Sequence, residues 1–405
     1  MKVELLAPAG DLERLKVAIE YGADAIYIGG KQFSLRARAS NFSLEDIKEA
    51  VEYAHQRNRK VFVTVNMIPH NSDFEGLKEY LQQLDEINVD AIICASAAIL
   101  TMTKELNLKM EVHISTQQTT TNSVAISYWQ NKKADRIVLA REVTYENLKE
   151  IMKETTLPIE VFIHGGMCAN FSGRCVISNM LTNRDANRGG CAQSCRWSYH
   201  LYHQNICIDN EDRLLSMGSK DMCAYDYLER LLDINVASLK IEGRMKTAYY
   251  IATVVKAYRI LIDDYYQNGK ISQKALDEAE TLFKRGSNRE SFSGFYPGIP
   301  DINGQIYNND VQANQSYLAN VIDYSAGIAT VEVRNYFKLN DRLRIFNPQG
   351  EDVYFDVTSL VDLNGETVEI ANKPMQVLKM KVPVEVNNFT FITKSETYYE
   401  KSSVN

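Results

Sequence analysis

The sequence lacks several features that would place it in a known class of protein directly. It has no apolar run of about 18 residues, the length that a membrane-spanning helix needs, so we expect no membrane partner. Its first residues, MKVELLAPAGD, contain Glu4 and a Pro-Ala-Gly turn and do not have the pattern of a secretory signal peptide. The cysteine count, seven, is odd. Together these features predict a cytoplasmic protein whose thiols stay reduced.

Hydrolase motifs and an excess of positive charge are also absent. None of the six histidines lies in a His-Glu-x-x-His motif, and the chain has no Gly-x-Ser-x-Gly sequence. The Cys-x3-Cys-x2-Cys pattern of radical enzymes is missing as well, because Ser198 stands where its third cysteine would be. The formal net charge of −7 gives no broad attraction for phosphates, although a local basic surface is still compatible with it.

What the sequence does contain is a repeated alternation of helical patterns with short apolar runs. Eight such runs occur in the first 245 residues or so, and each is apolar almost throughout, as strands buried on both faces are. They begin at Val3, Tyr21, Lys60, Ile87, Met110, Lys132, Ile159 and Ile234. Helices are expected between them, with Asp11, Ser43 and Ser72 as N-caps. The alternation predicts an α/β fold, a (β/α)8 TIM-like barrel over residues 1–270; a doubly wound open sheet is the alternative.

The remainder of the chain has a different texture. A long amphipathic helix is expected from Thr247 to about Gln267, followed by a polar, turn-rich linker over residues 271–315. From Ser316 the chain shows short alternating runs separated by the turns NPQG and DLNG. We therefore expect a small all-β, barrel-like domain over residues 316–400.

Four cysteines lie together in a polar, glycine-rich insertion at residues 164–223, directly after the seventh expected strand. They are Cys168, Cys175, Cys191 and Cys195. Loops at this end of barrel strands carry the active sites of such folds. Four thiolates could hold an iron–sulfur cluster or a structural zinc, although only Cys191 and Cys195 have the close spacing of a zinc knuckle. They could also be ordinary cysteines, and Cys223 is an alternative fourth ligand.

Several motifs along the chain carry a family resemblance. VFIHGGMCANFSGRCVIS resembles the signature of the collagenase-like peptidases, a peptidase family of unassigned mechanism, and LLAPAGD, NRDANRGGCAQSCRWSY, SLKIEGRMK and SFSGFYPG support it. Within this family the sequence is most similar to the bacterial proteins of prephenate-dependent tRNA uridine 5-hydroxylation. The resemblance implies an enzyme that takes part in O2-independent 5-hydroxylation of the wobble uridine of tRNA.

The same resemblance implies a cofactor and partners. A [4Fe-4S] cluster would be held by the four clustered cysteines. Sister groups differ in which fourth cysteine they use, so Cys223 stays an alternative fourth ligand. Prephenate would be the co-substrate, and a homologous partner subunit or a homodimer would be compatible with the family. Two alternatives stay open: a collagenase-like peptidase, for which His164 and Cys168 offer a pair, and an RNA-binding protein with a structural zinc.

Charged residues near the carboxyl ends of the expected strands are candidates for the site at the barrel mouth. Lys240 and Glu242 are catalytic candidates together with His164. Arginine binds carboxylates with two parallel hydrogen bonds, so a dicarboxylate such as prephenate points to a substrate-binding set near the mouth. The members of this set are Arg36, Arg38, Asn41, Arg141 and Arg244. For RNA, the candidate cations are Arg184, Arg188, Arg196, Lys284, Arg285, Arg289, Arg342 and Arg344, with Trp197 for base stacking.

Overall fold

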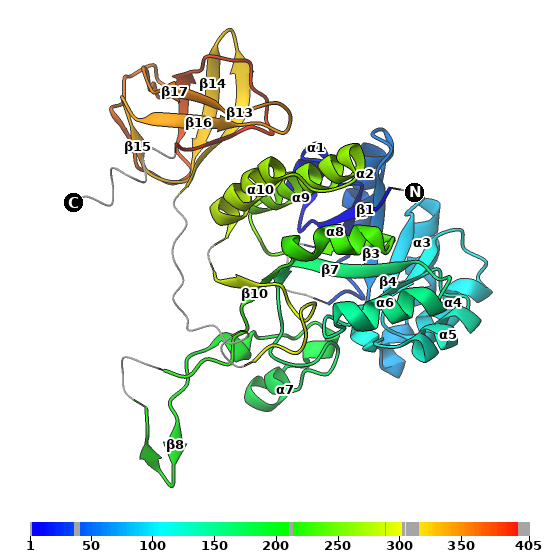
Figure 1. Ribbon diagram of the computed structural model, residues 1–405. Helices are drawn as coiled ribbons and strands as arrows, with labels where there is room; N and C mark the ends of the chain where they lie inside the picture. The colour runs from blue at the N-terminus through cyan, green and yellow to red at the C-terminus, as the bar shows by residue number, and fades with distance from the viewer. Residues whose placement is uncertain are drawn as a thin grey trace.

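The computed structural model describes residues 2–35, 41–209, 214–287, 289–301, 304 and 316–395. Its main body is a closed ring of eight parallel strands, because the last strand pairs with both the first and the seventh (Figure 1). The strands are β1 (Glu4–Pro8), β2 (Ala25–Gly29), β3 (Lys60–Val65), β4 (Ala91–Cys94), β5 (Glu111–Ile114), β6 (Arg136–Val138), β7 (Ile159–Gly166) and β11 (Ser238–Ile241). All eight expected strands are present, and the predicted TIM-like barrel is confirmed.

Helices surround the ring, and local capping explains where several of them begin. The Asp11 carboxylate accepts from the backbone of Arg14, and Ser43 forms a capping box with Asp46, as expected. The Ser72 cap is wrong, because its helix begins later, after Gly76 in a left-handed conformation. The helices are α1 (Leu12–Glu20), α2 (Leu44–His55), α3 (Leu77–Glu86), α4 (Ala97–Glu105), α5 (Ser123–Asn131), α6 (Tyr145–Glu154), α8 (Leu228–Asp233) and α9 (Ala248–Asn268).

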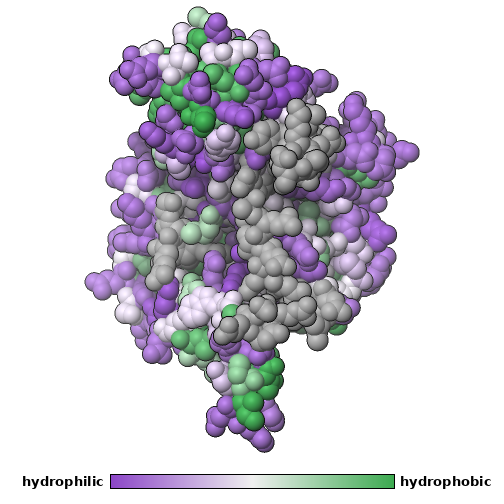
Figure 2. Space-filling view, turned by 90° about the vertical axis from the view of Figure 1, so that its left-hand side faces the viewer, coloured by the Kyte–Doolittle hydropathy of each residue, from purple (hydrophilic) through white to green (hydrophobic). Residues whose placement is uncertain are grey.

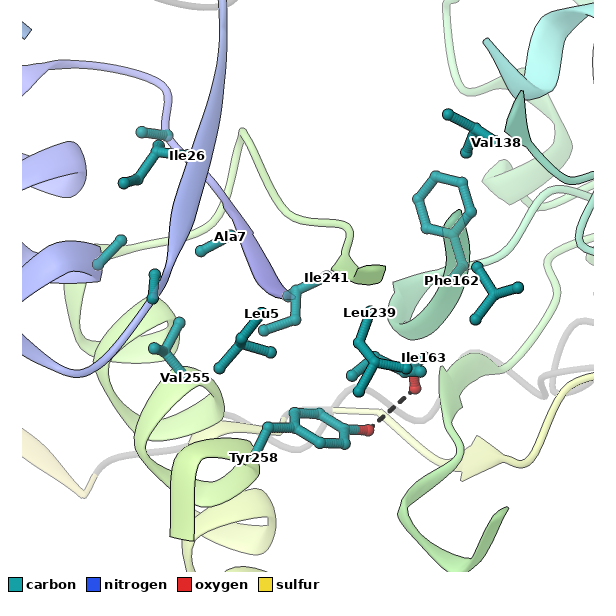
Figure 3. Packing of buried hydrophobic residues seen from close by; sticks show 14 of the residues in the cluster. Leu5, Ala7, Ile26, Val138, Phe162, Ile163, Leu239, Ile241, Val255 and Tyr258 are labelled. Atoms are coloured by element: carbon teal, nitrogen blue, oxygen red, sulfur yellow. Dashed lines mark hydrogen bonds between the residues drawn. The ribbon is translucent and has the colours of Figure 1, made fainter. Parts of the chain in front are cut away.

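The main hydrophobic core fills the layer between the strands and these helices. Figure 3 shows Leu5, Leu239 and Ile241 of the ring packed toward Val255 and Tyr258 of α9. The hydroxyl of Tyr258 donates to the backbone oxygen of Ile163 at 2.9 Å, so this buried polar group is satisfied. Outward-facing residues of the strands therefore serve packing, and the chemistry must come from the inner face and the strand ends.

The inside of the ring carries buried charges as well as apolar side chains. Lys240 Nζ lies 2.6 Å from Glu160 Oε1, and Arg136 contacts the other oxygen of Glu160 at 3.1 Å and Glu4 at 2.5 Å. Charges that are buried in a protein need such partners, since desolvation is costly. These four residues, the inner ion network, come from β1, β6, β7 and β11 and hold the two ends of the ring together.

The segment between β7 and β11 contains the cysteine-rich insertion. It includes the short helix α7 (Ile177–Thr182), a two-stranded hairpin that projects away from the body, and a strand that pairs antiparallel with β7 (Figure 1). These strands are β8 (Tyr202–His203), β9 (Ile206–Cys207) and β10 (Asp221–Cys223). Short 3-10 turns in the chain are Asn71–Phe74, Thr116–Gln118, Ala186–Arg188, Ser194–Arg196 and Tyr225–Tyr227.

Part of the segment expected to be a linker is ordered structure. Residues Gln273–Gly286 form helix α10, and β12 (Ser291–Phe292) extends the sheet next to β10. The helix forms because Ala275, Ala279, Leu282 and Phe283 recur on one face and are buried, while the Ser272 hydroxyl caps its first turn. The prediction of a linker over residues 271–315 is therefore wrong where α10 and β12 form.

The C-terminal unit is an all-β domain, as expected, and it packs on the barrel beside α1, α9 and α10 (Figure 1). The hydroxyl of Tyr21 donates to the backbone oxygens of Phe346 and Phe389, and Tyr249 stacks on Tyr317 at 5.0 Å. Its strands are β13 (Tyr317–Ser325), β14 (Ile328–Val333), β15 (Phe337–Lys338), β16 (Arg342–Phe346), β17 (Val353–Asp356), β18 (Ile370–Ala371), β19 (Val377–Lys381) and β20 (Phe391–Lys394). Among the described helices of the whole chain, none has both the length and the apolarity to cross a bilayer.

Candidate functional site

A pocket of about 200 Å³ lies at the mouth of the barrel, where the carboxyl ends of the strands meet the cysteine-rich insertion. The barrel contributes residues that follow β3, β5, β6 and β11, and the insertion covers them from above the mouth. The barrel side of the lining includes Thr64, Asn66, Ser115, Thr116, Gln117, Arg141, Phe162, Lys240, Glu242 and Arg244. This is the end of the fold at which barrel enzymes bind their substrates.

All four clustered cysteines line this same pocket. Cys168 and Cys191 are exposed, and Cys175 and Cys195 are partly buried. Burial raises the pKa of the Cys195 thiol, and the three neighbouring thiols add to this effect while Arg196 opposes it. The sequence distance of 27 residues between the first and the last cysteine is therefore closed by the fold.

Specific contacts hold the loop between Cys168 and Cys175 against the barrel. Gly173 has a φ of +74°, and a Cβ atom there would lie 2.1 Å from the backbone oxygen of Gln117, so only glycine fits. Thr119 donates its hydroxyl to the backbone oxygen of Ser172 at 2.6 Å, and Glu142 accepts from the Ser172 backbone at 2.9 Å. The loop is thus fixed to the segments that follow β5 and β6.

The second pair of cysteines is fixed by α7 and by polar contacts within the insertion. The buried hydroxyl of Ser178 accepts from the backbone of Ala192 at 3.1 Å, directly beside Cys191. Arg196 donates to the backbone oxygen of Met167 at 3.1 Å, which ties the region of Cys195 to the region of Cys168. The insertion therefore presents its thiols from a framework of hydrogen bonds rather than from an apolar core.

The arrangement of the thiols differs from that of a closed zinc site. A tetrahedral zinc with Zn–S bonds of about 2.3 Å brings its sulfur atoms to about 3.8 Å of one another. In the described part of the chain, three ligand atoms come within 4.8 Å of one another at one place only, and that place is not the four thiols. Four thiols that line one pocket are the kind of ligand that an iron–sulfur cluster takes.

Arg244 and Asn41 come together at the pocket wall, as candidates for one site should. Arg244 is buried and donates to Asn41 Oδ1 at 2.7 Å, to Ser34 Oγ at 3.2 Å and to Thr64 Oγ1 at 3.3 Å. Its guanidinium is held in one orientation by these contacts. Arg36 and Arg38, the other two candidates from this part of the chain, lie outside the described residues.

Lys240 lines the floor of the pocket and forms an ion pair with Glu160. Burial lowers the pKa of Lys240, although Glu160 at 2.6 Å raises it. Burial alone would raise the pKa of Glu160, but Lys240 and Arg136 together hold it below its ordinary value. The ammonium also lies 4.6 Å from the ring of Tyr27. Glu160 was not predicted from the sequence as a site residue. Its position as a charged residue inside the apolar run of β7 could have identified it.

Arg141 and Glu242 are the remaining charged residues of the lining. The guanidinium of Arg141 lies 3.9 Å from the ring centroid of Phe162, and in the described part of the chain it forms no ion pair with a carboxylate within 4.0 Å. Glu242 accepts from the backbone of Gly166 at 3.3 Å. With Glu160 counted against Lys240, the three cations Arg141, Lys240 and Arg244 still exceed the two carboxylates by one charge, which suits an anionic ligand.

His164 and Cys223 lie on the other side of β7 and are absent from the pocket lining. The pairing of β7 with β11 has an irregularity after Lys240 and Phe162, so His164 opposes the outward-facing Ile241. His164 stacks on Phe283 at 5.2 Å, and burial lowers its pKa to about 3. Burial raises the pKa of Cys223 to about 12. The pair of His164 with Cys168, which the peptidase alternative would use, is not supported, because the irregularity turns the imidazole into the core.

The arginines considered for RNA have different settings. Arg344 is fully buried, forms an ion pair with Asp352 and donates a hydrogen bond to Thr393. The prediction that it contacts RNA is therefore wrong, and its role is structural. Arg188 pairs with Asp73, and Arg289 lies 3.8 Å from Asp221. Trp197 is 46% exposed beside the cysteine-rich insertion and remains available for stacking.

Comparison with known proteins adds a family to this geometry. The profile of "Peptidase family U32" matches residues 10–306, and that of "Peptidase family U32 C-terminal domain" matches residues 313–392. The tRNA hydroxylation protein P1 of Bacillus subtilis is 38% identical over 95% of this chain and 93% of its own length. The 23S rRNA 5-hydroxycytidine C2501 synthase of Escherichia coli is 38% identical over 71% of this chain and 44% of its own. A protein named collagenase from Porphyromonas gingivalis is 28% identical over 94% of each chain.

Proposed function

This chain belongs to peptidase family U32, and from that premise we propose that it takes part in the hydroxylation of RNA, with tRNA as its substrate. In its specific form, the proposal is O2-independent, prephenate-dependent 5-hydroxylation of the wobble uridine. The observation that carries it is the pocket itself, in which four thiols and the cations Arg141, Lys240 and Arg244 face one space. Relatives named for the hydroxylation of tRNA and of rRNA support the RNA class.

The four thiols would hold a [4Fe-4S] cluster, with Cys168, Cys175, Cys191 and Cys195 as its ligands. Such a cluster supplies electron transfer, or binding of the oxygen-bearing co-substrate, next to the base. The donor set fits, since all four are thiols, two are exposed, and they line one pocket. Cys223 is the weaker candidate for the fourth position because it is buried beside Tyr258 and does not reach this lining.

The protein's own residues would bind and orient the small anion. Arg244 is held rigidly by Asn41, Ser34 and Thr64, so it would meet a carboxylate with little loss of side-chain freedom. Arg141 would supply a second cation across the pocket, since in the described part of the chain it has no carboxylate partner. Lys240, already paired with Glu160, would add positive potential at the floor. A target base would have to enter unpaired, because a base that is paired and stacked cannot reach a pocket of this kind.

A peptidase is the weaker alternative, although a relative named collagenase keeps it in view. A cysteine nucleophile needs a histidine within hydrogen-bond reach, and His164 is turned into the core with Tyr258 and Phe283 around it. Structural zinc is also less well supported, because the thiols do not converge as a tetrahedral site requires.

The test is a deletion strain whose tRNA is digested and examined for 5-hydroxyuridine by mass spectrometry. We expect the nucleoside to disappear on deletion and to return with the wild-type chain, but not with Cys191→Ser. The matched control is Cys94→Ala, since Cys94 is buried in β4 and is absent from the pocket lining. Undiminished 5-hydroxyuridine in the deletion strain would reject the proposed reaction. Iron and sulfide measured on anaerobically purified protein test the cluster separately.

A further inference from the structure

The β8–β9 hairpin carries a second group of metal-binding side chains, and none of them lines the pocket. We propose that His200, Cys207 and Asp209 bind one zinc-like divalent cation that links the two strands at the base of this hairpin. One ligand atom from each residue lies within 4.8 Å of the other two. This site is independent of the proposed RNA chemistry, because it uses no residue of the pocket.

The distances suit a small cation of zinc's coordination chemistry. Cys207 Sγ lies 2.8 Å from Asp209 Oδ1, His200 Nδ1 lies 3.2 Å from the same oxygen, and the sulfur and nitrogen atoms are 4.0 Å apart. A tetrahedral zinc, with bonds of about 2.0–2.3 Å, needs its ligand atoms about 3.3–3.8 Å apart. A small outward movement of the carboxylate oxygen produces this spacing. Nitrogen, sulfur and carboxylate oxygen are the ligands that zinc takes, and three of them leave one position for water.

Asp209 is already oriented toward the other two residues. Its side chain is only 6% exposed, although the hairpin around it is open to solvent. One carboxylate oxygen accepts from the backbone of Leu201 at 2.8 Å, which turns the other toward His200 and Cys207.

The hairpin has a structural need for such a link. Its two strands pair through Tyr202 with Cys207 and His203 with Ile206, joined by a two-residue turn. A two-stranded hairpin by itself is marginally stable in water. Packing does not compensate here, since Tyr202, Ile206 and Ile208 are 65%, 67% and 62% exposed, and Figure 2 shows apolar side chains gathered on this projection at the bottom of the view. Metal binding would supply the missing stabilisation.

The test measures how fast Cys207 reacts with iodoacetamide in the full-length wild-type protein, with and without Zn²⁺. Trypsin releases residues 197–213 as one peptide with Cys207 as its single cysteine, whereas the pocket cysteines fall in other peptides. We expect Zn²⁺ to slow alkylation of Cys207 at least tenfold, EDTA to reverse the effect, and Mg²⁺ to have none, since it prefers oxygen ligands. Zinc held by the pocket alone would protect only the other peptides, and that outcome would overturn the proposal.

Two variants separate coordination from a general change in the hairpin. His200→Ala should lose the protection by Zn²⁺, because it removes one of three ligands. His203→Ala is the matched control: it removes a histidine from the same hairpin, and His203 is outside the ligand group. Protection that survives in His200→Ala, or is lost equally in His203→Ala, would exclude this ligand set.

Discussion

The two faces of β7 place similar residues in opposite chemical settings. On the inner face, Glu160 and Phe162 meet Lys240, and the strand then leads to Cys168 at the pocket. On the outer face, His164 lies with Cys223 among the rings of Tyr258 and Phe283. Inside, charges are paired and thiols reach a cavity; outside, burial keeps imidazole and thiol neutral.

The difference shows that residue type alone does not identify a reactive group. A histidine four positions from a cysteine suggests a catalytic pair, but one irregularity in strand register sends the two side chains to different sides of the sheet. The inner face can bind ligands because it ends in a pocket, whereas on the outer face the imidazole is buried against the rings of Tyr258 and Phe283. Four experiments would break or sharpen this comparison.

The largest effect is expected when the two competing fourth cysteines are compared. Cys195→Ala should lose most of its iron, because Cys195 lines the pocket with the other three thiols, while Cys223→Ala should keep the wild-type iron content. The measurement is iron and sulfide per chain after anaerobic purification. If the Cys223 variant loses iron and the Cys195 variant keeps it, then Cys223, and not Cys195, is the fourth ligand.

The second-largest effect is expected from a substitution in the inner ion network. Lys240→Met should cost about 3 kcal/mol of unfolding free energy, near the low end for a broken buried pair, because Arg136 still contacts Glu160. The measurement is urea denaturation. Lys240→Met combined with Glu160→Gln should recover part of the loss, since no unpaired charge is left behind. This account would be contradicted if the double variant lost more unfolding free energy than the two single variants lose together.

The outer face predicts a dependence of stability on pH. The folded pKa of His164 is lowered to about 3, so the unfolded chain binds a proton below its ordinary value of about 6.5 and the folded chain does not. Stability should therefore fall as the pH drops through this window, by about 1.4 kcal/mol per unit from this residue. His164→Phe should reduce the slope by that amount between about pH 6 and pH 4 while RNA hydroxylation is retained. An unchanged slope would mean that His164 is solvated.

The smallest effect is expected at the pocket wall. If the proposed function holds, Arg141→Ala should slow the formation of 5-hydroxyuridine about tenfold, equivalent to about 1.4 kcal/mol, because it removes one cation from the pocket lining. Arg57→Ala is the control, since Arg57 pairs with Glu20 and lies outside the pocket. Modification followed over time after induction of each variant gives the two rates. Equal rates would remove Arg141 from the substrate site.

The ring of strands could be predicted from the sequence because each strand is a short apolar run that can be recognised without its neighbours. All eight apolar runs became strands, and the caps at Asp11 and Ser43 formed as expected. Helix α10 was missed because its polar face and the turn-rich stretch after it masked the apolar spacing of Leu282, Phe283 and their neighbours. The sequence nevertheless contains the pattern of this helix, namely Ser272 as its N-cap and apolar residues at helical spacing after it.

The site was predictable in part. The sequence brought Lys240, Arg244, Asn41 and the cysteines forward as candidates, and the structure places them around one pocket or against its wall. It could not reveal the register irregularity that removes His164, because pairing between β7 and β11 joins residues about 80 positions apart. The setting of Arg344 was hidden for the same reason, since its partners Asp352 and Thr393 are fixed only by the folded β domain.

The inner ion network also has a consequence for the order of folding. Glu4 comes from the first strand of the ring and Lys240 from the last, and Arg136 and Glu160 connect them. An incomplete ring would leave at least one of these charges buried without a partner or exposed to water in an open sheet. Burial of the network is therefore possible only when the first and last strands meet. Closure of the barrel and dehydration of its interior should be a single late event, and half-barrel fragments of this chain should remain hydrated and unstable.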